Sequence, residues 1–206
     1  MSYRDVNDIY ISHLHADHVG GMEFMGFACK FDPGCAKPGL YISDSIKDDL
    51  WNNCLSGGMS PVDDKRCTLS DFFSVHGISD EGRFSWEGIE FSLVLADHVG
   101  GGEISMNSYG LFFTIGNKSV YLTTDIKFSP RRVGKYLQDA DLILHDCETS
   151  ANVSGVHARF EDLLGLPEEI RSKTWLYHYD DGPLPDALGS GFLGFVKRGQ
   201  VFDLPE

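Results

Sequence analysis

The stretch His13-Leu14-His15-Ala16-Asp17-His18 places four side chains that can ligate a metal ion within six residues. It directly follows a short apolar run, residues 9–11, which is typical of a buried strand. Four ligands at this spacing cannot share one face of a helix or strand, so we expect a loop that folds around a cation. Imidazole and carboxylate groups together suit Zn²⁺ or a similar divalent ion. A histidine-rich loop that merely faces solvent is the weaker interpretation, because clustered histidines need partners.

Length and composition indicate one globular domain over residues 1–206, with 42% hydrophobic and 23% charged residues. No apolar run approaches the roughly 18 residues of a membrane span, which excludes an integral membrane protein. Residues 1–8 lack the features of a secretory signal, so we expect a cytoplasmic location. The formal net charge of −14 repels polyanions and disfavours long nucleic acids as partners.

Apolar runs indicate strands with interleaved helices, which is an α/β layered arrangement. Turns are expected at Glu87-Gly88 and Gly116-Asn117, a helix cap at Ser43 or Asp44, and a helix break near Pro167. Helices are expected over residues 22–28, 44–54, 130–137 and 159–171, and strands over 41–42, 72–75, 83–86, 89–95, 109–115, 119–123, 142–144 and 175–177. Gly57-Gly58 is expected to end the second helix. The five cysteines are scattered without a C-x-x-C pair, so we expect reduced, mostly buried thiols.

The motif H-x-H-x-D-H after a strand, followed by Gly20-Gly21, resembles the signature of the metallo-β-lactamase superfamily of metal-dependent hydrolases. The resemblance continues in order nearly to the C-terminus and implies a four-layer αβ/βα sandwich. It also implies further ligands at His98, Asp125 and His178, each of which follows an apolar run. On this basis one Zn²⁺ ion is assigned to His13, His15 and His98, a second Zn²⁺ ion to Asp17, His18 and His178, and the bridging position to Asp125. Mn²⁺ or another divalent ion is an alternative.

An aspartate at the bridging position, where the β-lactamases themselves use cysteine, resembles the branch of tRNA 3′-processing endonucleases and related phosphodiesterases. In that branch an acidic residue orients a histidine, which protonates the leaving alkoxide. Asp146, after the run 142–144, and His157 match these two roles. The plainer alternatives are a turn or capping aspartate at the end of a strand and a solvent-facing histidine at the start of a helix.

Two features depart from the family pattern. Members normally have N-terminal strands well before the motif, whereas only residues 1–12 precede it here. We therefore expect a truncated form, a second chain that supplies the strands, or a trimmed variant of the fold. A sheet edge exposed in this way favours association, so a homodimer is expected. The second departure is that only 52 residues separate Asp125 from His178, whereas the tRNA-processing enzymes carry a long basic arm there.

The sequence thus predicts a dinuclear metal hydrolase that cleaves a phosphodiester in a small, cyclic nucleotide, similar to the small phosphodiesterases of this branch. One alternative is a ribonuclease like the tRNA-processing enzymes, which requires a basic groove. Another is an ester, thioester or lactone hydrolase of the same fold, in which Asp146 and His157 are dispensable because the leaving group needs little protonation. The third is a non-catalytic remnant that binds a metal or a partner.

Overall fold

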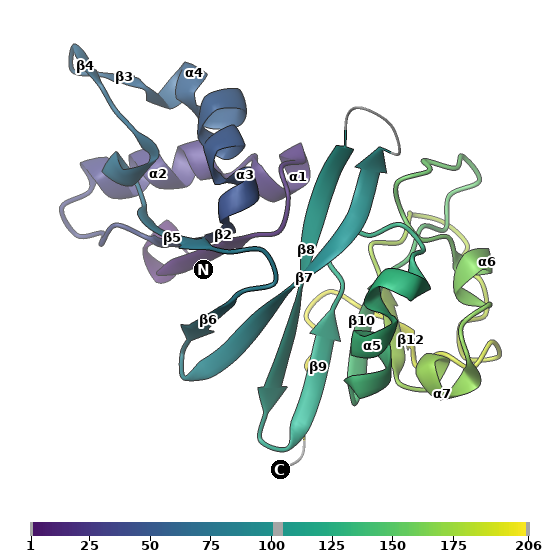
Figure 1. Cartoon of the computed structure of the whole chain (residues 1–206). Coiled ribbons are helices and arrows are strands. Elements are labelled where there is room, and N and C mark those ends of the chain that lie inside the picture. Colours follow the sequence, from purple (N-terminus) through teal and green to yellow (C-terminus); the bar gives the residue numbers. More distant parts are fainter. Residues whose placement is uncertain (1, 101–104, 205–206) are drawn as a thin grey trace. The chain divides into compact units, whose positions relative to one another are not determined.

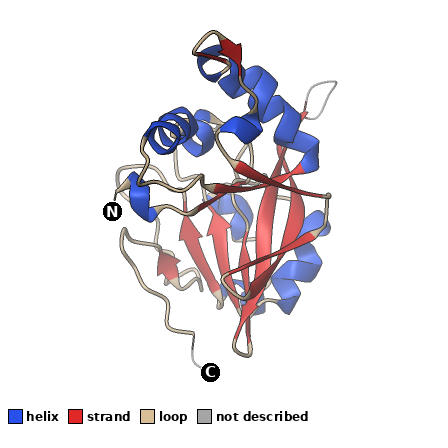
Figure 2. Cartoon of the chain, turned by 90° about the vertical axis from the view of Figure 1, so that its left-hand side faces the viewer, coloured by secondary structure: helices blue, strands red, loops and turns tan. Residues whose placement is uncertain are grey.

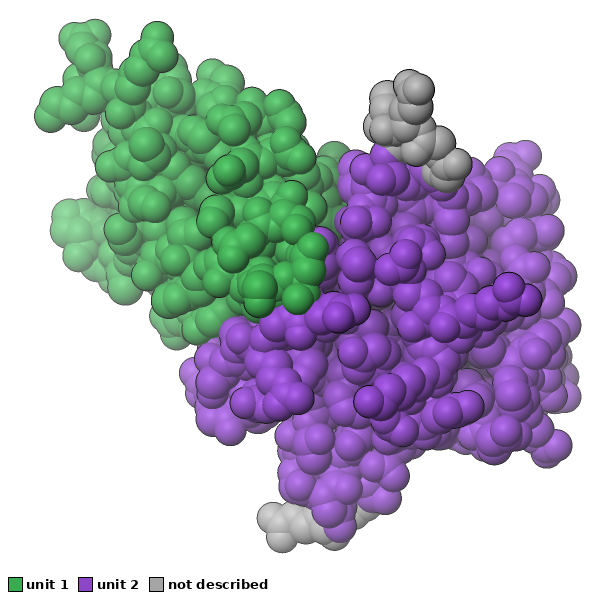
Figure 3. Space-filling model, viewed as in Figure 1, with its two compact units in different colours: residues 1–80 green, residues 81–206 purple. Residues whose placement is uncertain are grey.

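The computed structural model describes residues 2–100 and 105–204, and the chain divides into two compact units. Unit 1 comprises residues 1–80 and unit 2 comprises residues 81–206 (Figure 3). Each unit has a sheet and helices of its own, so the mixed α/β composition expected from the sequence is confirmed (Figure 2). The single domain over residues 1–206 stays a prediction. Within the described ranges no helix combines the length and the apolar character that crossing a membrane requires.

Unit 1 contains a three-stranded parallel sheet with the strand order β1-β2-β5. The strands are β1 (Asp8–Ile11), β2 (Gly39–Ser43) and β5 (Ser74–Ile78), and a separate hairpin is formed by β3 (Pro61–Val62) and β4 (Lys65–Arg66). The central strand is the most buried one, and its Leu40 and Ile42 are fully buried. Because the strands are parallel, their carboxyl ends share one edge of the sheet, and the chain leaves β1 there.

Helices of unit 1 precede the first strand and fill the connections between the strands (Figure 1). They are the 3₁₀ turn η1 (Tyr3–Asp5), α1 (Ala16–Val19), α2 (Met22–Phe31), α3 (Asp44–Asp49), the π-helical η2 (Leu50–Leu55), α4 (Ser56–Met59) and the 3₁₀ turn η3 (Leu69–Asp71). Ser43 begins α3 as expected, because its hydroxyl accepts a hydrogen bond from the Ser45 amide.

The expectation that Gly57-Gly58 ends this helix is wrong, since the helical path continues through η2 and α4 to Met59. The buried side chains Leu50, Leu55 and Met59 explain the path. Leu50 and Leu55 are five residues apart, and one π-helical turn brings such a pair onto the same face. A Cβ at Gly58 would lie 2.8 Å from a carboxylate oxygen of Glu23, so α2 passes close to the glycine. Packing here outweighs the weak helix propensity of glycine.

The expectation of five reduced thiols is also wrong, because Cys29 and Cys35 form a disulfide. After α2 the chain turns back at Asp32, whose Oδ1 accepts a hydrogen bond from the Gly34 amide and whose carbonyl accepts one from the Cys35 amide. This turn brings the two Cα atoms to 5.0 Å, which is within the range of a disulfide. Cys54, Cys67 and Cys147 are free, and of these three Cys147 is buried.

Unit 2 contains a seven-stranded sheet with the order β12-β11-β10-β9-β8-β7-β6. Its strands are β6 (Arg83–Trp86), β7 (Ile89–Gly100), β8 (Ser105–Ile115), β9 (Lys118–Leu122), β10 (Leu142–Asp146), β11 (Thr174–Tyr177) and β12 (Gly194–Phe195). Strands β6 to β9 form antiparallel hairpins, whereas β9 to β12 are parallel neighbours. The predicted turns at Glu87-Gly88 and Gly116-Asn117 are confirmed, and both glycines have positive φ.

The helices of unit 2 pack on one face of this sheet (Figure 1). They are α5 (Pro130–Asp139), α6 (Phe160–Leu163) and α7 (Glu168–Arg171), and the predicted break at Pro167 separates the last two. Val133 and Leu137 of α5 and Leu163 of α6 join Tyr121 and Ile143 of the sheet in one buried apolar cluster. This cluster anchors β9, β10 and β11, whose carboxyl ends carry polar side chains.

Gly110 provides a test of how tightly β8 and β9 are packed. A Cβ at this position would lie 2.8 Å from the carbonyl oxygen of Leu122 and 2.9 Å from that of Thr123, and neither backbone atom can move cheaply. We expect Gly110→Ala to lower the free energy of unfolding by about 1–3 kcal/mol, as overpacking does. A Cβ at Gly134 on α5 would meet no atom within 4 Å, so we expect Gly134→Ala to raise the free energy of unfolding by up to about 1 kcal/mol. Urea unfolding of both variants measures the difference, and equal effects would contradict the packing argument.

Candidate metal centre

In unit 1 the four residues of the H-x-H-x-D-H motif lie directly beyond the carboxyl end of β1. We call them the unit-1 cluster: His13, His15, Asp17 and His18. The chain leaves the strand after Ile11, and His15 has extended backbone angles that make it the N-cap residue of α1. The short helix then carries Asp17 and His18. The predicted loop is present over residues 12–15, and Asp17 and His18 lie in the short helix that follows it.

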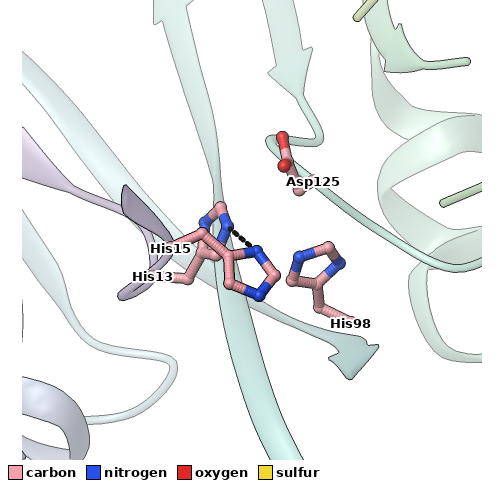
Figure 4. Close-up of side chains that lie close together, drawn as sticks. All are labelled: His13, His15, His98 and Asp125. Atoms are coloured by element: carbon pink, nitrogen blue, oxygen red, sulfur yellow. Dashed lines mark hydrogen bonds between the residues drawn. The ribbon is translucent and has the colours of Figure 1, made fainter. Parts of the chain in front are cut away.

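Donor atoms of the unit-1 cluster face one another in pairs. Nε2 of His13 lies 3.1 Å from Nδ1 of His15 (Figure 4, dashed line). Nε2 of His18 lies 3.5 Å from Oδ2 of Asp17. The rings of His13 and His18 are also neighbours, with centroids 4.0 Å apart. Two nitrogen atoms, or a nitrogen and a carboxylate oxygen, at such separations suit a shared cation.

In unit 2 three parallel strands deliver side chains to one edge of the sheet. Asp125 follows β9, Asp146 is the last residue of β10, and His178 follows β11. The loop after β10 adds His157. We call these four residues the unit-2 cluster, and one donor atom from each lies within 4.8 Å of all the others. The convergence follows from topology, because parallel neighbours end together and polar sites gather at those ends.

Asp146 and His157 form a hydrogen-bonded ion pair within this cluster. Oδ2 of Asp146 lies 2.7 Å from Nδ1 of His157 and also accepts a hydrogen bond from the Ile126 amide at 2.9 Å. Burial raises the pKa of the Asp146 carboxyl, but the hydrogen bonds from His157 and His178 outweigh it and hold that pKa below its usual range. Burial likewise lowers the pKa of His157, and the bond to Asp146 outweighs it and raises that pKa above the ordinary value. The pair therefore favours a charged imidazolium on a carboxylate.

His178 contacts both aspartates of the unit-2 cluster. Its Nε2 lies 3.7 Å from Oδ2 of Asp125, and its Nδ1 lies 3.4 Å from Oδ1 of Asp146. The residue has a φ of 61°, a left-handed conformation that is uncommon for any residue other than glycine. This backbone turns the imidazole toward the strand ends instead of along β11, and such unusual angles are concentrated at functional sites.

His98 lies inside β7 rather than after a strand, which corrects the expected end of that strand at residue 95. The pairing of β7 with β8 shifts register between Asp97 and Val99, so a β-bulge falls on His98. The ring is buried, and its Nδ1 donates a hydrogen bond of 2.9 Å to the carbonyl oxygen of Val156. Because a carbonyl can only accept, a neutral His98 has its proton on Nδ1 and its lone pair on Nε2. A donor atom of His98 lies within 4.8 Å of one of Asp125, and Figure 4 shows both side chains.

The donor chemistry of both clusters fits divalent cations. Imidazole nitrogens and carboxylate oxygens are ligands that Zn²⁺ and Mn²⁺ accept. The hydrogen bond from His98 to a backbone carbonyl is the outer contact that metal-binding histidines usually make, since it fixes the tautomer and the ring orientation. Each predicted ligand thus lies in one of these two groups or, for His98, beside Asp125.

Several contacts around the candidate ligands were not found by sequence reasoning. The Thr123 hydroxyl accepts a hydrogen bond from the Asp146 amide at 3.0 Å, and the Thr124 hydroxyl lies 2.7 Å from that of Ser108. The carbonyl of Val156 orients His98. A backbone carbonyl has no sequence signal, and the threonines show only as polar residues at the end of an apolar run.

Comparison with known proteins supports one family over nearly the whole chain. A family model described as "Anti-Pycsar protein Apyc1" matches residues 1–202. The Apyc1 protein of Paenibacillus sp. (strain J14) is 30% identical over 207 residues, which cover 98% of this chain and 80% of the relative. The Apyc1 protein of Bacillus phage vB_BsuM-Goe3 is 31% identical over 206 residues, which cover 95% and 77%. The crystal structure of the metallo-beta-lactamase fold protein YhfI from Bacillus subtilis matches with a TM-score of 0.67 at 16% identity, over 98% of this chain and 79% of YhfI.

The Asp146–His157 pair predicts a measurable titration in metal-free protein. Burial lowers the pKa of His157 and Asp146 raises it, so Asp146→Asn leaves mainly the effect of burial. We expect the pKa of His157 to lie above about 6.5 in the wild-type protein and to fall below it in this variant. The ring-proton NMR shift, followed against pH and assigned with His157→Gln, measures the change. Asp139→Asn, which removes an exposed carboxylate from the end of α5, serves as the control and should leave the titration where it is. An unchanged pKa in Asp146→Asn would contradict the pairing.

Proposed function

The chain belongs to the Anti-Pycsar protein Apyc1 family, and from this premise we propose that it hydrolyses the phosphodiester of a small cyclic nucleotide. Its fold is the metallo-β-lactamase fold, and it is a metal-dependent hydrolase of the phosphodiesterase type. The observation that carries the proposal is the unit-2 cluster, in which two aspartates and two histidines converge at the ends of parallel strands. A carboxylate-bound histidine beside candidate metal ligands suits the cleavage of a bond whose leaving group needs a proton.

We propose two divalent ions, most simply Zn²⁺, as the cofactors. The residues that would hold them are His13, His15 and His98 for one ion, Asp17, His18 and His178 for the other, and Asp125 for both. Ions at these positions would offset the phosphate charge and make a water molecule acidic enough to attack near neutral pH. They would also counter the net charge of −14, which otherwise repels an anionic substrate.

The proton for the leaving alkoxide is assigned to His157. Its Nδ1 is held by Oδ2 of Asp146, so the proton available for transfer is the one on Nε2. Asp146 raises the pKa of His157 against the effect of burial, which favours the protonated imidazole that a proton donor requires. After the transfer, Asp146 still holds the neutral ring in the same orientation. This division of roles explains why Asp146 is buried and hydrogen-bonded to a half-buried His157.

A small substrate agrees with the charge of the chain better than RNA does. Lys and Arg number 17 against 31 acidic residues, so the chain as a whole repels a polyanion. A mononucleotide needs only one phosphodiester to be neutralised. We place the activity in the cytoplasm, where such a nucleotide would be met. The homodimer expected from the sequence stays a prediction.

Metal removal is expected to abolish turnover reversibly. We expect the purified protein to contain two divalent ions per chain and to hydrolyse 2′,3′- or 3′,5′-cyclic mononucleotides. Dialysis against a chelator should remove both the ions and the activity, and added Zn²⁺ or Mn²⁺ should restore them. Elemental analysis and chromatographic assay of product measure the two quantities together. The Asp125→Ala variant should likewise lose the bound ions and the activity.

The same assay separates the alternatives. Turnover of pre-tRNA without turnover of cyclic nucleotides would favour the ribonuclease, and turnover of a thioester alone would favour the ester hydrolase. Metal binding without turnover of any of these substrates would leave the non-catalytic binding protein as the best account.

Removing the proton donor should matter only when the leaving group is poor. We expect His157→Gln to slow kcat for a cyclic nucleotide by about 10²–10⁴-fold, the range that general acids supply. Turnover of bis-p-nitrophenyl phosphate should change much less, because p-nitrophenolate leaves without protonation. His76→Gln, an exposed histidine on β5 of unit 1, is the matched control and should leave both rates unchanged. Equal losses for the two substrates in His157→Gln would contradict the role of proton donor.

A further inference from the structure

Ser12, between β1 and the unit-1 cluster, makes a contact that the proposed function does not use. The side chain is 4% exposed, and its hydroxyl oxygen lies 3.0 Å from Nδ1 of His13 and 3.2 Å from Nδ1 of His18. The proposed function assigns these two histidines to different metal ions. The same hydroxyl group therefore contacts one proposed ligand of each metal ion, at the ring nitrogen Nδ1.

The other ring nitrogen, Nε2, of each histidine lies near a further proposed metal ligand. Nε2 of His13 is directed at Nδ1 of His15, 3.1 Å away, and Nε2 of His18 lies 3.5 Å from Oδ2 of Asp17. A ring that gives its Nε2 lone pair to a cation keeps its proton on Nδ1. Both Nδ1–H groups then point at the hydroxyl of Ser12, whose oxygen has two lone pairs and can accept both bonds.

Resting on the proposed function, we infer that Ser12 is a positioning residue that couples the two metal ions. Its oxygen fixes the tautomer and the orientation of His13 for one ion and of His18 for the other. The backbone supports this role, since Ser12 directly follows β1, whose pairing with β2 runs up to Ile11 and Ile42. Loss of this single hydroxyl should therefore weaken the binding of both ions, whereas loss of an ordinary ligand weakens mainly the binding of the ion that it contacts.

The test compares four substitutions by competition with a chromophoric Zn²⁺ chelator. Ser12→Ala is expected to lower the affinity for each of the two ions by about 10- to 100-fold, which is the usual effect of removing a residue that hydrogen-bonds a metal ligand. Ser12→Thr retains a hydroxyl and should restore both affinities. Asp17→Asn is the one-ion reference, and Ser43→Ala is the matched control. The Ser43 hydroxyl is equally buried at the end of the neighbouring strand, but it donates to Asp80 and should be silent in metal binding.

A second readout does not depend on affinity. In the Zn²⁺-loaded protein, Nδ1–H protons of His13 and His18 held by Ser12 should give slowly exchanging imidazole NMR signals. These signals should be lost in Ser12→Ala and kept in Ser12→Thr and Ser43→Ala. Absence of both signals from the wild-type protein would contradict the inferred hydrogen bonds.

The outcomes distinguish failure of the role inferred for Ser12 from failure of the proposed function. If the wild-type protein takes up no ions, the proposed function fails and the coupling fails with it. If the wild-type protein binds two ions and Ser12→Ala binds them equally well, only the inference is overturned. Loss of one ion alone in Ser12→Ala, as in Asp17→Asn, also overturns it, and so does an equal loss in Ser43→Ala.

Discussion

The buried carboxylate of Asp146 is the interaction on which the arrangement of unit 2 depends. A charge taken out of water is costly unless hydrogen bonds replace its hydration. Oδ2 of Asp146 meets that requirement by binding the Ile126 amide and Nδ1 of His157. These bonds tie together the segment after β9, the end of β10 and the loop after β10. One carboxylate thus fixes three segments that are distant in sequence, and it also sets the protonation of the histidine beside it.

Backbone strain at two strand ends is explained by the same constraint. Thr124 and His178 have φ values of 52° and 61°, which are sterically unfavourable for side chains with a Cβ. Such conformations cost on the order of 1–3 kcal/mol each and persist only when their surroundings determine them. The hydroxyl of Thr124 bonds that of Ser108, and His178 contacts Asp146. The strained residues flank Asp125 and turn the chain so that side chains leave the strands toward one point.

How far the sequence predicts this molecule depends on the range of each signal. Apolar runs and turn residues are local, so the hairpins at Glu87-Gly88 and Gly116-Asn117 are found correctly. Helix ends and strand lengths depend on packing partners elsewhere. The helix therefore continues past Gly58 because Leu55 and Met59 are buried, and β7 continues past residue 95 because β8 pairs with it.

The candidate site shows the same division. The H-x-H-x-D-H motif is recognisable because six consecutive residues carry it. His98, Asp125 and His178 were assigned only because the order of the family's motifs implies them. The bulge that directs His98 and the Val156 carbonyl that orients it are three-dimensional features without a signature of their own. The disulfide between Cys29 and Cys35 was missed for a similar reason, since it requires the chain reversal that Asp32 makes.

The proposed chemistry divides between parts that need cations and a part that does not. His157 and Asp146 belong to unit 2 alone, and protein hydrogen bonds hold them at 2.7 Å. The proposed metal ligands, in contrast, would act only through the cations that they hold. The proton donor is therefore organised before any cation binds, and no binding energy is spent on orienting it during the reaction. In such an arrangement, protonation of the leaving group is separable from the attack of water, which depends on the ions. The two can then be altered independently, even though both act on the same phosphodiester.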